Sequence, residues 1–199
     1  PTYQKPVLTL DTLTIADLSI SSSSPSSPSL SSSSITFSTT APTFTAPAMG
    51  NLDFADTEDL ITNEEDSEML SSRISEINSK ISEFSARIQE SQAVFNKENT
   101  EYQAELQKSI ENAKLNSQDD AQQIQKYNAE INDFQASVNK EIQEYRQNLE
   151  KELELWTRKR TTDLQKYQSD IQNNLNVFNK ENTEYQAELQ VSIQNAQLS

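Results

Sequence analysis

The sequence has no cysteine and no histidine among its 199 residues. A chain without cysteine forms no disulfides and no thiolate metal sites. A chain without histidine has no His-based catalytic triad, no His-ligated metal and no side chain that normally titrates near neutral pH. Paired acids such as Glu152 and Glu154 are expected on a solvated helix and not in a cleft. We therefore expect a protein that is not an enzyme and that binds no cofactor and no metal ion.

Glycine, proline and apolar residues are also scarce. The one glycine is Gly50 and the last of six prolines is Pro47, so the rest of the chain lacks both strong breakers of regular structure. Apolar residues make up 33% of the sequence, whereas a chain with a compact core has roughly 45–50%. No apolar run reaches the length of about 18 residues that a membrane span needs. We therefore expect an extended helical protein that does not cross a membrane.

The sequence is strongly acidic, with 31 Asp and Glu against 16 Lys and Arg and a formal net charge of −15. Binding to a phosphate backbone needs a basic face, which this composition does not supply. Anionic membrane surfaces also attract basic segments and repel acidic ones. We therefore expect neither nucleic acid nor a membrane surface as a partner.

Residues 1–60 differ in composition from the rest, and we call them the docking segment. In residues 19–38, 13 of 20 side chains are serine, and two prolines interrupt the run. The flanking stretches 7–15 and 35–40 have the β-branched, partly alternating pattern of strands or extended chain. One interpretation is a disordered low-complexity tail, and the other is a peptide that docks along a larger assembly. The apolar residues expected to make the docking contacts are Val7, Leu8, Leu10, Leu13, Ile15, Leu18, Ile20, Ile35, Phe37 and Phe44.

Residues 56–68 contain seven acidic side chains. They have neither the spacing nor the glycine of an EF-hand calcium loop, so we do not interpret them as a metal site. Carboxylates in the first turn of a helix complement its dipole, which favours a helix start. Thr62 and Glu65 match the capping-box pattern and predict a helix from about residue 64.

From about residue 64 to residue 199 the apolar residues recur along one helix face, which we call the seam. The spacing is first 3-4-3-4-7, typical of heptads, and later 11 residues, as in the aromatic series from Phe134 to Phe178. Heptads fall short of whole turns and 11-residue units overshoot them, each by about 20°. The predicted seam consists of Ile74, Ile77, Ile81, Phe84, Ile88, Phe95, Tyr102, Leu106, Ile110, Phe134, Val138, Ile142, Tyr145, Leu149, Leu153, Trp156, Leu164, Tyr167, Ile171, Leu175, Phe178, Tyr185, Leu189 and Ile193.

A long internal repeat overlies this period. Residues 94–107 recur unchanged as 177–190, at an offset of 83 residues, and residues 94–116 agree with 177–199 at 19 of 23 positions. We call these two stretches the first copy and the second copy. Four heptads and five 11-residue units add up to the offset, so their opposite drifts nearly cancel. The pattern therefore predicts a rod built by duplicating one helical module.

Three polar residues interrupt the seam: Asn99, Arg160 and Asn182. An asparagine at a seam position fixes register and strand number, and in a parallel homo-oligomer the copies would meet in one layer. Arg160 is expected either to pair with a carboxylate of a neighbouring strand or to extend out to water. The aromatic seam residues are interpreted as core and not as a ligand platform, and their bulk favours three strands over two.

Residues 115–120 are the weakest part of the seam, because Ser117 and Asp120 occupy positions where core residues are expected. Ser117 and Asp120 also match an N-cap pair. The stretch is compatible with a bend, a hinge or a turn between antiparallel helices. Because it contains neither glycine nor proline, we favour a continuous helix.

The duplicated block, Glu101–Gln107 and its recurrence at 184–190, followed by Ser192–Leu198, resembles repetitive coiled-coil virion proteins of tailed, particularly marine, bacteriophages. The resemblance covers most of residues 60–199. It implies a non-enzymatic structural protein of the phage particle, located at its surface, tail or neck. It further implies a fibre whose N-terminus is anchored on other virion proteins of the capsid, neck or tail.

Taken together, the sequence predicts a mainly α, fibrous protein. Its expected parts are the extended, Ser/Pro-rich docking segment 1–60 and a coiled-coil rod 61–199 with mixed 7- and 11-residue periodicity. The expected partners are other copies of the chain, in a parallel homotrimer, and other virion proteins bound through the docking segment. Two alternatives remain open, an internal rod of tape-measure type and the stalk of an elongated cell-surface adhesin.

Overall fold

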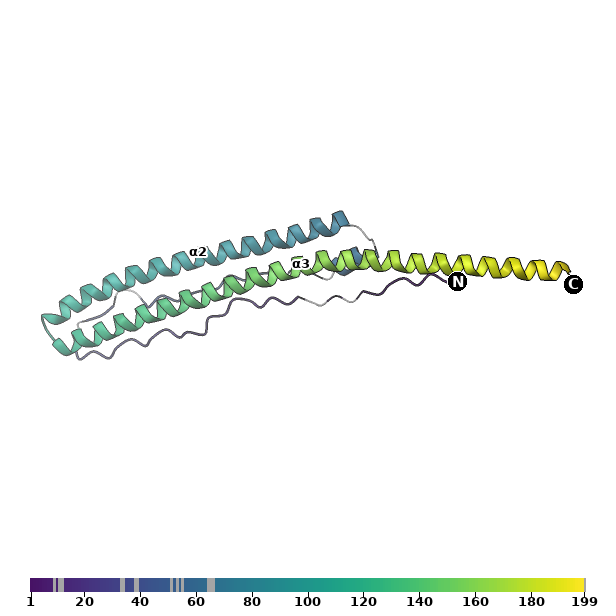
Figure 1. Cartoon of the computed structure of the whole chain (residues 1–199). Helices are drawn as coiled ribbons and strands as arrows, with labels where there is room; N and C mark the ends of the chain where they lie inside the picture. The colour runs from purple at the N-terminus through teal and green to yellow at the C-terminus, as the bar shows by residue number, and fades with distance from the viewer. Residues whose placement is uncertain are drawn as a thin grey trace. The chain divides into compact units, whose positions relative to one another are not determined.

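The structure is a computed structural model of the whole chain, and it describes all residues except 9, 11, 12, 33, 34, 38, 39, 51, 53, 55, 64, 65, 66 and 199. The described residues form three helices and no strand: α1 (Asp56–Thr62), α2 (Ser67–Lys114) and α3 (Gln118–Leu198) (Figure 1). The expectation of a mainly α-helical protein is confirmed. The described residues before α1 form neither helix nor strand.

The chain divides into two compact units, each built from several stretches of sequence. Unit 1 consists of Pro1–Thr14, Asp53–Ile77 and Leu153–Ser199. Unit 2 consists of Ile15–Leu52 and Asn78–Glu152. Each unit thus combines part of the docking segment with parts of the long helices. The predicted boundary at residue 60 was placed where the composition changes. The two units are instead defined by which residues pack together.

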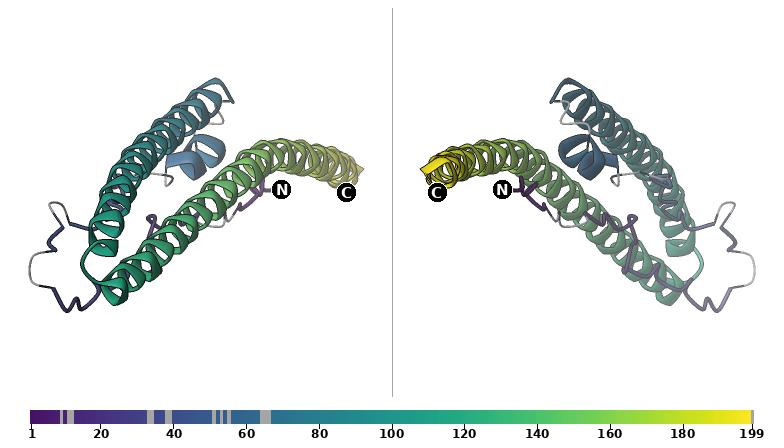
Figure 2. Two further views of the ribbon diagram at one scale, coloured as in Figure 1. Left: turned by 90° about the vertical axis from the view of Figure 1, so that its left-hand side faces the viewer. Right: turned by 90° about the vertical axis from the view of Figure 1, so that its right-hand side faces the viewer.

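Unit 2 contains a helical hairpin, formed by residues 78–114 of α2 and 118–152 of α3 (Figures 1 and 2). The two helices are antiparallel, because Tyr102 meets Tyr127 near the turn and Phe84 meets Tyr145 far from it. The apolar stripes of the two helices therefore face each other within one chain. The core near the turn consists of Tyr102, Leu106, Ile110, Ala113, Ala121, Ile124, Tyr127 and Ile131.

A tight turn joins the two helices of the hairpin. The amides of Asn116 and Ser117 donate to the Ala113 carbonyl over 3.0 and 2.7 Å, which ends α2. The Ser117 hydroxyl accepts a hydrogen bond from the Asp120 amide over 3.3 Å and caps the first turn of α3. The favoured continuous helix is therefore wrong. The turn forms because the polar side chains satisfy backbone groups at the helix end, and reversal of the chain then buries the seam.

The first helix begins earlier than the sequence predicted. Residues 56–62 form α1, although they were expected to belong mostly to the extended docking segment. Thr62 is the last residue of α1 and its hydroxyl donates to the Glu58 carbonyl over 2.9 Å, so its assignment as an N-cap is wrong. Its expected partner Glu65 and the expected helix start at residue 64 lie outside the described residues. The acidic first turn belongs to α1 instead.

Unit 1 has a second, smaller core. Leu60 and Ile61 of α1 are buried with Leu70 of α2 and Tyr167 of α3. The Tyr167 hydroxyl also donates to the Thr62 carbonyl over 3.0 Å, which satisfies one of the free carbonyls at the end of α1. Within this unit the short helix α1 thus covers part of the apolar stripe of α3.

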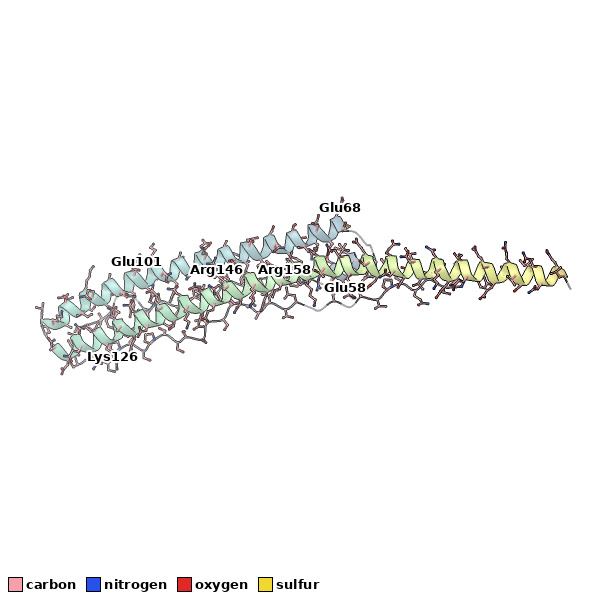
Figure 3. All side chains as sticks on the ribbon, in the orientation of Figure 1. Glu58, Glu68, Glu101, Lys126, Arg146 and Arg158 are labelled. Atoms are coloured by element: carbon pink, nitrogen blue, oxygen red, sulfur yellow. The ribbon has the colours of Figure 1, made fainter. Side chains whose placement is uncertain are left out.

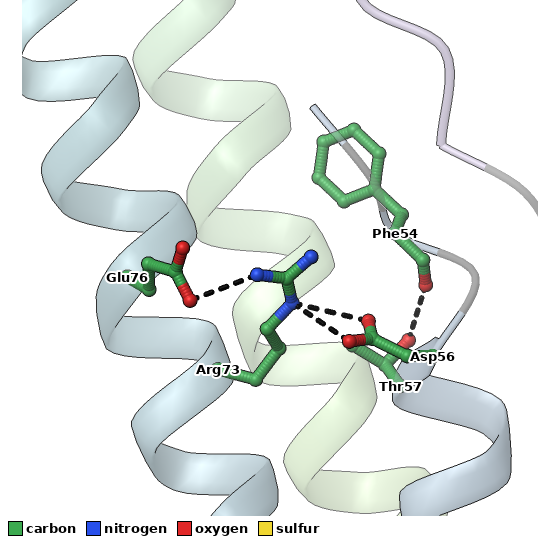
Figure 4. A network of polar contacts seen from close by, with 5 residues as sticks. All are labelled: Phe54, Asp56, Thr57, Arg73 and Glu76. Atoms are coloured by element: carbon green, nitrogen blue, oxygen red, sulfur yellow. Dashed lines mark hydrogen bonds and ion pairs between the residues drawn. The ribbon is translucent and has the colours of Figure 1, made fainter. Parts of the chain in front are cut away.

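Arg73 links α1 to α2 within unit 1 (Figure 4). Its Nε donates to the Asp56 carboxylate over 3.1 Å and its Nη1 donates to Glu76 over 2.8 Å. The hydrogen bond to Glu76, followed by the contact with Asp56, raises the pKa of Arg73. Where the chain enters α1, the Thr57 hydroxyl donates to the Phe54 carbonyl over 2.8 Å. These contacts fix the direction in which the chain enters and leaves the short helix.

Replacing Leu106 by alanine should destabilise the helical hairpin by about 2–5 kcal/mol, because a buried leucine leaves a cavity when it is truncated. Leu106 is 0% exposed. Leu189 is the equivalent residue of the second copy, within the same local sequence, and it is 48% exposed. Leu189→Ala is therefore the matched control, and it should change the stability of the hairpin little. Urea unfolding of both variants in dilute solution, followed by circular dichroism, measures the difference. Equal losses would contradict the burial of the first copy in the hairpin.

Candidate functional site: a helical hairpin that binds the docking segment

Most of the predicted seam is buried inside the single chain. The residues no more than 8% exposed are Ile77, Ile81, Phe84, Ile88, Phe95, Tyr102, Leu106, Ile110, Phe134, Val138, Ile142, Leu149, Trp156 and Tyr167. The half-buried ones are Ile74, Tyr145, Leu153, Leu164, Ile171 and Phe178. The exposed ones are Leu175, Tyr185, Leu189 and Ile193. The seam was expected to lie between chains, but these contacts form within one chain because the turn brings its two halves together.

Aromatic side chains form successive layers across the hairpin. Phe95 meets Phe134 at 5.9 Å between ring centroids and 84° between planes, which is the edge-to-face geometry that aromatic pairs prefer. Tyr102 and Tyr127 meet at 6.2 Å and 89°, and their hydroxyls are 3.0 Å apart in a buried hydrogen bond. Burial, followed by the hydrogen bond to Tyr127, raises the pKa of Tyr102 well above its ordinary value. The rings are therefore part of the core of the hairpin.

A ladder of side-chain amides lies beside these layers. Asn96 Oδ1 accepts hydrogen bonds from Gln135 Nε2 and Asn139 Nδ2, both over 3.0 Å. Gln135 Oε1 accepts from Gln103, and Asn139 Oδ1 accepts from Gln92, again over 3.0 Å. Each amide matches a specific partner on the other helix, so a shift of α2 along α3 would break the ladder. The ladder therefore fixes the register of the hairpin.

The docking segment lies along the helices of its own chain in unit 2. Leu30, Ile35, Phe37 and Ala41 pack against the core near the turn. The Phe37 ring is 6.0 Å from Tyr127, and the Phe44 ring is 5.9 Å from Phe95. Leu18 is 5% exposed, and Ile15 and Ile20 are half-buried, as is Leu13 in unit 1. Ile35, Phe37 and Phe44 thus contact the chain's own helices.

Glu141 holds the first part of the segment in unit 2. Its carboxylate accepts hydrogen bonds from the amides of Ser21 and Ser22 over 2.6 and 2.9 Å. The hydroxyls of both serines donate to the same carboxylate. The hydrogen bonds, that from the Ser22 hydroxyl most of all, lower the pKa of Glu141 because they stabilise its charged form. We call this arrangement, and the equivalent one at Asp120, a serine clasp.

The second serine clasp lies close to the turn. Asp120 accepts hydrogen bonds from the amides of Ser31 and Ser32 over 2.7 and 3.0 Å and from the Ser31 hydroxyl over 2.9 Å. The bond from the Ser31 amide is the main cause that lowers the pKa of Asp120. Asp120 was expected at a core position, and it is indeed 2% exposed. Its burial is tolerated because three donors from Ser31 and Ser32 satisfy its carboxylate.

Two further contacts position the docking segment in unit 2. The Tyr145 hydroxyl donates to the Ala16 carbonyl over 2.6 Å. Burial, with the nearby charges of Asp17 and Glu152, raises the pKa of Tyr145 to about 12, so the hydroxyl stays protonated. The Met49 amide donates to Asp17 over 3.4 Å and joins the two ends of this part of the segment.

The docking segment also contacts helices in unit 1. Leu8 and Leu10 pack against the core of α1 and α3. Asn174 donates to the Gln4 carbonyl over 2.8 Å, and the Tyr3 ring meets Phe178 edge-on at 6.4 Å. Of the predicted docking residues, Val7 alone is exposed, at 92%.

Asn99 and Arg160, two of the polar seam residues, are buried and each contacts its own helix. Asn99 is 0% exposed, and its Nδ2 donates to the Phe95 carbonyl over 2.8 Å. Its Oδ1 has no hydrogen-bond partner among the described residues. Arg160 is 2% exposed, pairs with Asp163 of the same helix over 3.1 Å and lies over the Trp156 ring. Arg160 therefore does not extend out to water.

The second copy is the part of the seam that the described residues leave uncovered. Asn182 is half-buried, but Tyr185, Leu189 and Ile193 are 53%, 48% and 48% exposed. Their counterparts in the first copy are buried in the hairpin. The same local sequence is therefore covered in one place and open in the other.

Sequence reasoning missed part of the core. Ile124, Tyr127 and Ile131 are fully buried, and with Phe134 and Val138 they continue the 3-4 spacing of the seam. This signal was readable. The same 3-4 spacing leads from Ser117 and Asp120 to Ile124, so the predicted seam passes through these residues although they were omitted from it. Leu60 and Ile61 were missed because α1 is too short to display a period. Leu70 lies in α2 and continues the spacing of the seam, so it could have been identified.

The described residues offer little chemistry beyond packing. No group of three or more His, Cys, Asp or Glu among them is placed to hold a metal ion. An open groove of about 560 Å³ in unit 2 is lined by Gln92, Asn139 and Arg146 with other polar side chains. In the part of the chain that is described, no helix is long and apolar enough to cross a membrane.

In comparisons with known proteins, no protein-family model, no curated protein and no solved structure matches the chain. The arrangement of a helical hairpin, a bound extended segment and an uncovered repeat is therefore the basis for any functional proposal.

Acidification should release the docking segment from the two clasps. The folded pKa values of Asp120 and Glu141 lie below the ordinary values of 3.8 and 4.5, because serine amides and hydroxyls donate to the carboxylates. Such groups stabilise the folded chain above the ordinary pKa, and this stability is lost as the pH falls through the lowered one. Protection of the Ser21, Ser22 and Ser31 amides from hydrogen exchange, measured by NMR, should persist at neutral pH and disappear on acidification.

Glu141→Gln separates the two clasps. The variant should remove the protection of the Ser21 and Ser22 amides at every pH, because the neutral amide group accepts fewer and weaker hydrogen bonds. Protection of Ser31 should still follow the titration of Asp120. If the serine amides stay protected until the helices themselves unfold, the carboxylates do not hold the segment.

Proposed function

We propose that this chain is a non-enzymatic structural protein of a virion, a fibre of a tailed bacteriophage. It would associate with its own copies through helices and be anchored through residues 1–60 on the capsid, neck or tail. The observation that carries the proposal is the duplicated helical module, one copy of which is buried while the other is exposed. The class of protein comes from the resemblance of both copies to coiled-coil virion proteins.

The helices support an elongated structural role. A stripe of about one apolar residue per turn suits contacts along neighbouring helices better than burial in a globular core. Within α3 the aromatic series from Phe134 to Phe178 recurs every 11 residues, so the stripe turns only slowly around this helix. α3 contains 81 residues, which at about 1.5 Å per residue gives a helix about 120 Å long. A mixed-period coiled coil of this kind is suited to a fibre.

The docking segment supports the proposed anchor by the way it binds helices. Consecutive serine amides donate to a carboxylate at each clasp, and apolar side chains such as Phe37 and Phe44 pack on aromatic rings. Extended peptides commonly bind protein surfaces through this combination of backbone hydrogen bonds and alternate apolar contacts. An acidic, helical surface of another virion protein would offer the segment the same contacts. We therefore expect the anchor to compete with the chain's own helices.

Purified particles of the phage that encodes the chain test the proposal. Mass spectrometry should find the chain as a stoichiometric component, and a cryo-EM map should show helical density with residues 1–60 ordered against the capsid, neck or tail. The map would also show how many chains share the helical part, for which we expect three. Absence of the chain from purified particles would overturn the proposal. Density inside the tail tube would favour the tape-measure alternative instead.

A further inference from the structure

We propose that the second copy is the surface through which chains of this protein associate, with the second copies of neighbouring chains parallel and in register. The exposed face is thus covered by the same segment of another chain of this protein. This inference deepens the proposed function and rests on it for its setting, because it names the surface by which the subunits of the fibre would join.

The first copy shows how much burial this sequence requires. Tyr102 and Leu106 are 3% and 0% exposed, whereas the equivalent Tyr185 and Leu189 are 53% and 48% exposed. Residues 94–107 and 177–190 are identical, so the same face has the same capacity to bind another helix. Full burial of one such side chain is worth about 1.5–3 kcal/mol. Several exposed positions along one face therefore supply a driving force for association.

The chain's own docking segment covers only the beginning of this face. Tyr3 contacts Phe178, and Gln4 accepts a hydrogen bond from Asn174. Beyond Phe178 the apolar residues towards the end of α3 are exposed. In Figure 3 the side chains at the yellow end of α3 project outward around the helix. The open part of the face therefore needs an occupant other than the described docking segment.

The positions at which the two copies differ point to the occupant. Three exposed charges of the first copy are lost in the second: Lys108, Glu111 and Lys114 are replaced by Val191, Gln194 and Gln197. Residues 189–198 consequently carry no charged side chain, although the chain has a net charge of −15. Copies with this charge repel one another, so they can approach most closely where the charge is absent. The end of α3 is the segment that meets this condition.

Asn182 indicates a parallel arrangement. Its counterpart Asn99 lies in an antiparallel hairpin, where Nδ2 donates to the Phe95 carbonyl and Oδ1 has no partner among the described residues. A buried acceptor without a partner is unfavourable. In a parallel, in-register assembly the Asn182 side chains of all copies lie in one layer and can donate to one another. Parallel association therefore gives the Asn182 side-chain oxygen a hydrogen-bond donor, which the equivalent oxygen of Asn99 lacks among the described residues of the antiparallel hairpin.

Sedimentation equilibrium of the full chain tests whether the second copy carries the association. The wild-type chain should form a concentration-dependent oligomer. Leu189→Glu with Ile193→Glu should weaken the association about a hundredfold or more, because two apolar contacts are replaced by like charges in each chain. Circular dichroism should stay close to wild type, since both side chains are about half exposed and lie outside the hairpin. A monomeric wild-type chain would overturn the proposal.

A second pair of acidic substitutions is the matched control. Asn176→Glu with Thr183→Glu adds the same two charges to α3 at exposed positions on the opposite side of the helix. This variant should keep the wild-type association. If it weakens association as much as the pair at 189 and 193, general charge repulsion and not the apolar face controls assembly, and the proposal fails.

Single cysteines test the orientation, because the natural chain contains none. Asn182→Cys should form a disulfide-linked dimer on mild oxidation if the copies are parallel and in register. In an antiparallel pair centred midway between these two positions, position 182 would face position 193. Linkage that appears only when Asn182→Cys is mixed with Ile193→Cys would overturn the parallel arrangement.

The two proposals fail in distinguishable ways. A chain that associates through its second copy but is absent from phage particles would retain the interface and overturn the virion function. A chain present in particles but monomeric in solution and unaffected by the pair at 189 and 193 would retain the function and overturn the interface.

Discussion

Covering a narrow apolar stripe is the constraint on which the rest of the structure depends. A single helix cannot bury its own apolar stripe, so another element must cover it. In unit 2 the covering elements are the other helix of the hairpin and the docking segment. Phe95 illustrates both, since Phe134 of α3 contacts its ring and Phe44 of the docking segment also contacts it. In unit 1 the short helix α1 packs on Tyr167 of α3.

Polar contacts determine where these covering elements lie. Apolar burial is not directional, and a seam with several similar layers would allow the helices to shift by a heptad. The amide ladder around Asn96 removes this freedom, because each amide has a specific partner on α3. The serine clasps at Glu141 and Asp120 do the same for the docking segment. Ser21, Ser22, Ser31 and Ser32 therefore have a structural role, since consecutive serines present backbone amides and hydroxyls to one carboxylate.

Much of the helical part was predictable, because helix period is a local property of sequence. The seam residues from Ile77 to Leu149 were identified from spacing, and most are buried. The N-cap pair at Ser117 and Asp120 was recognised as well, but the absence of glycine and proline was given more weight than the cap. Ile124, Tyr127 and Ile131 continue the same spacing and could have been identified from it as well. The contacts of the docking segment were not predictable, because extended chain has no period that identifies the surface on which it lies.

The sequence by itself determined that most residues of α2 and α3 are helical and which face of these two helices is apolar, since both follow from spacing and from the lack of breakers. Only the tertiary structure decided what covers that face. Residues 94–107 and 177–190 are identical, yet the first stretch is buried by α3 and the docking segment while the second is exposed. The physical reason is that an apolar stripe gains the same free energy from any complementary helix. The turn at Ser117 supplies such a helix to the first copy within the same chain.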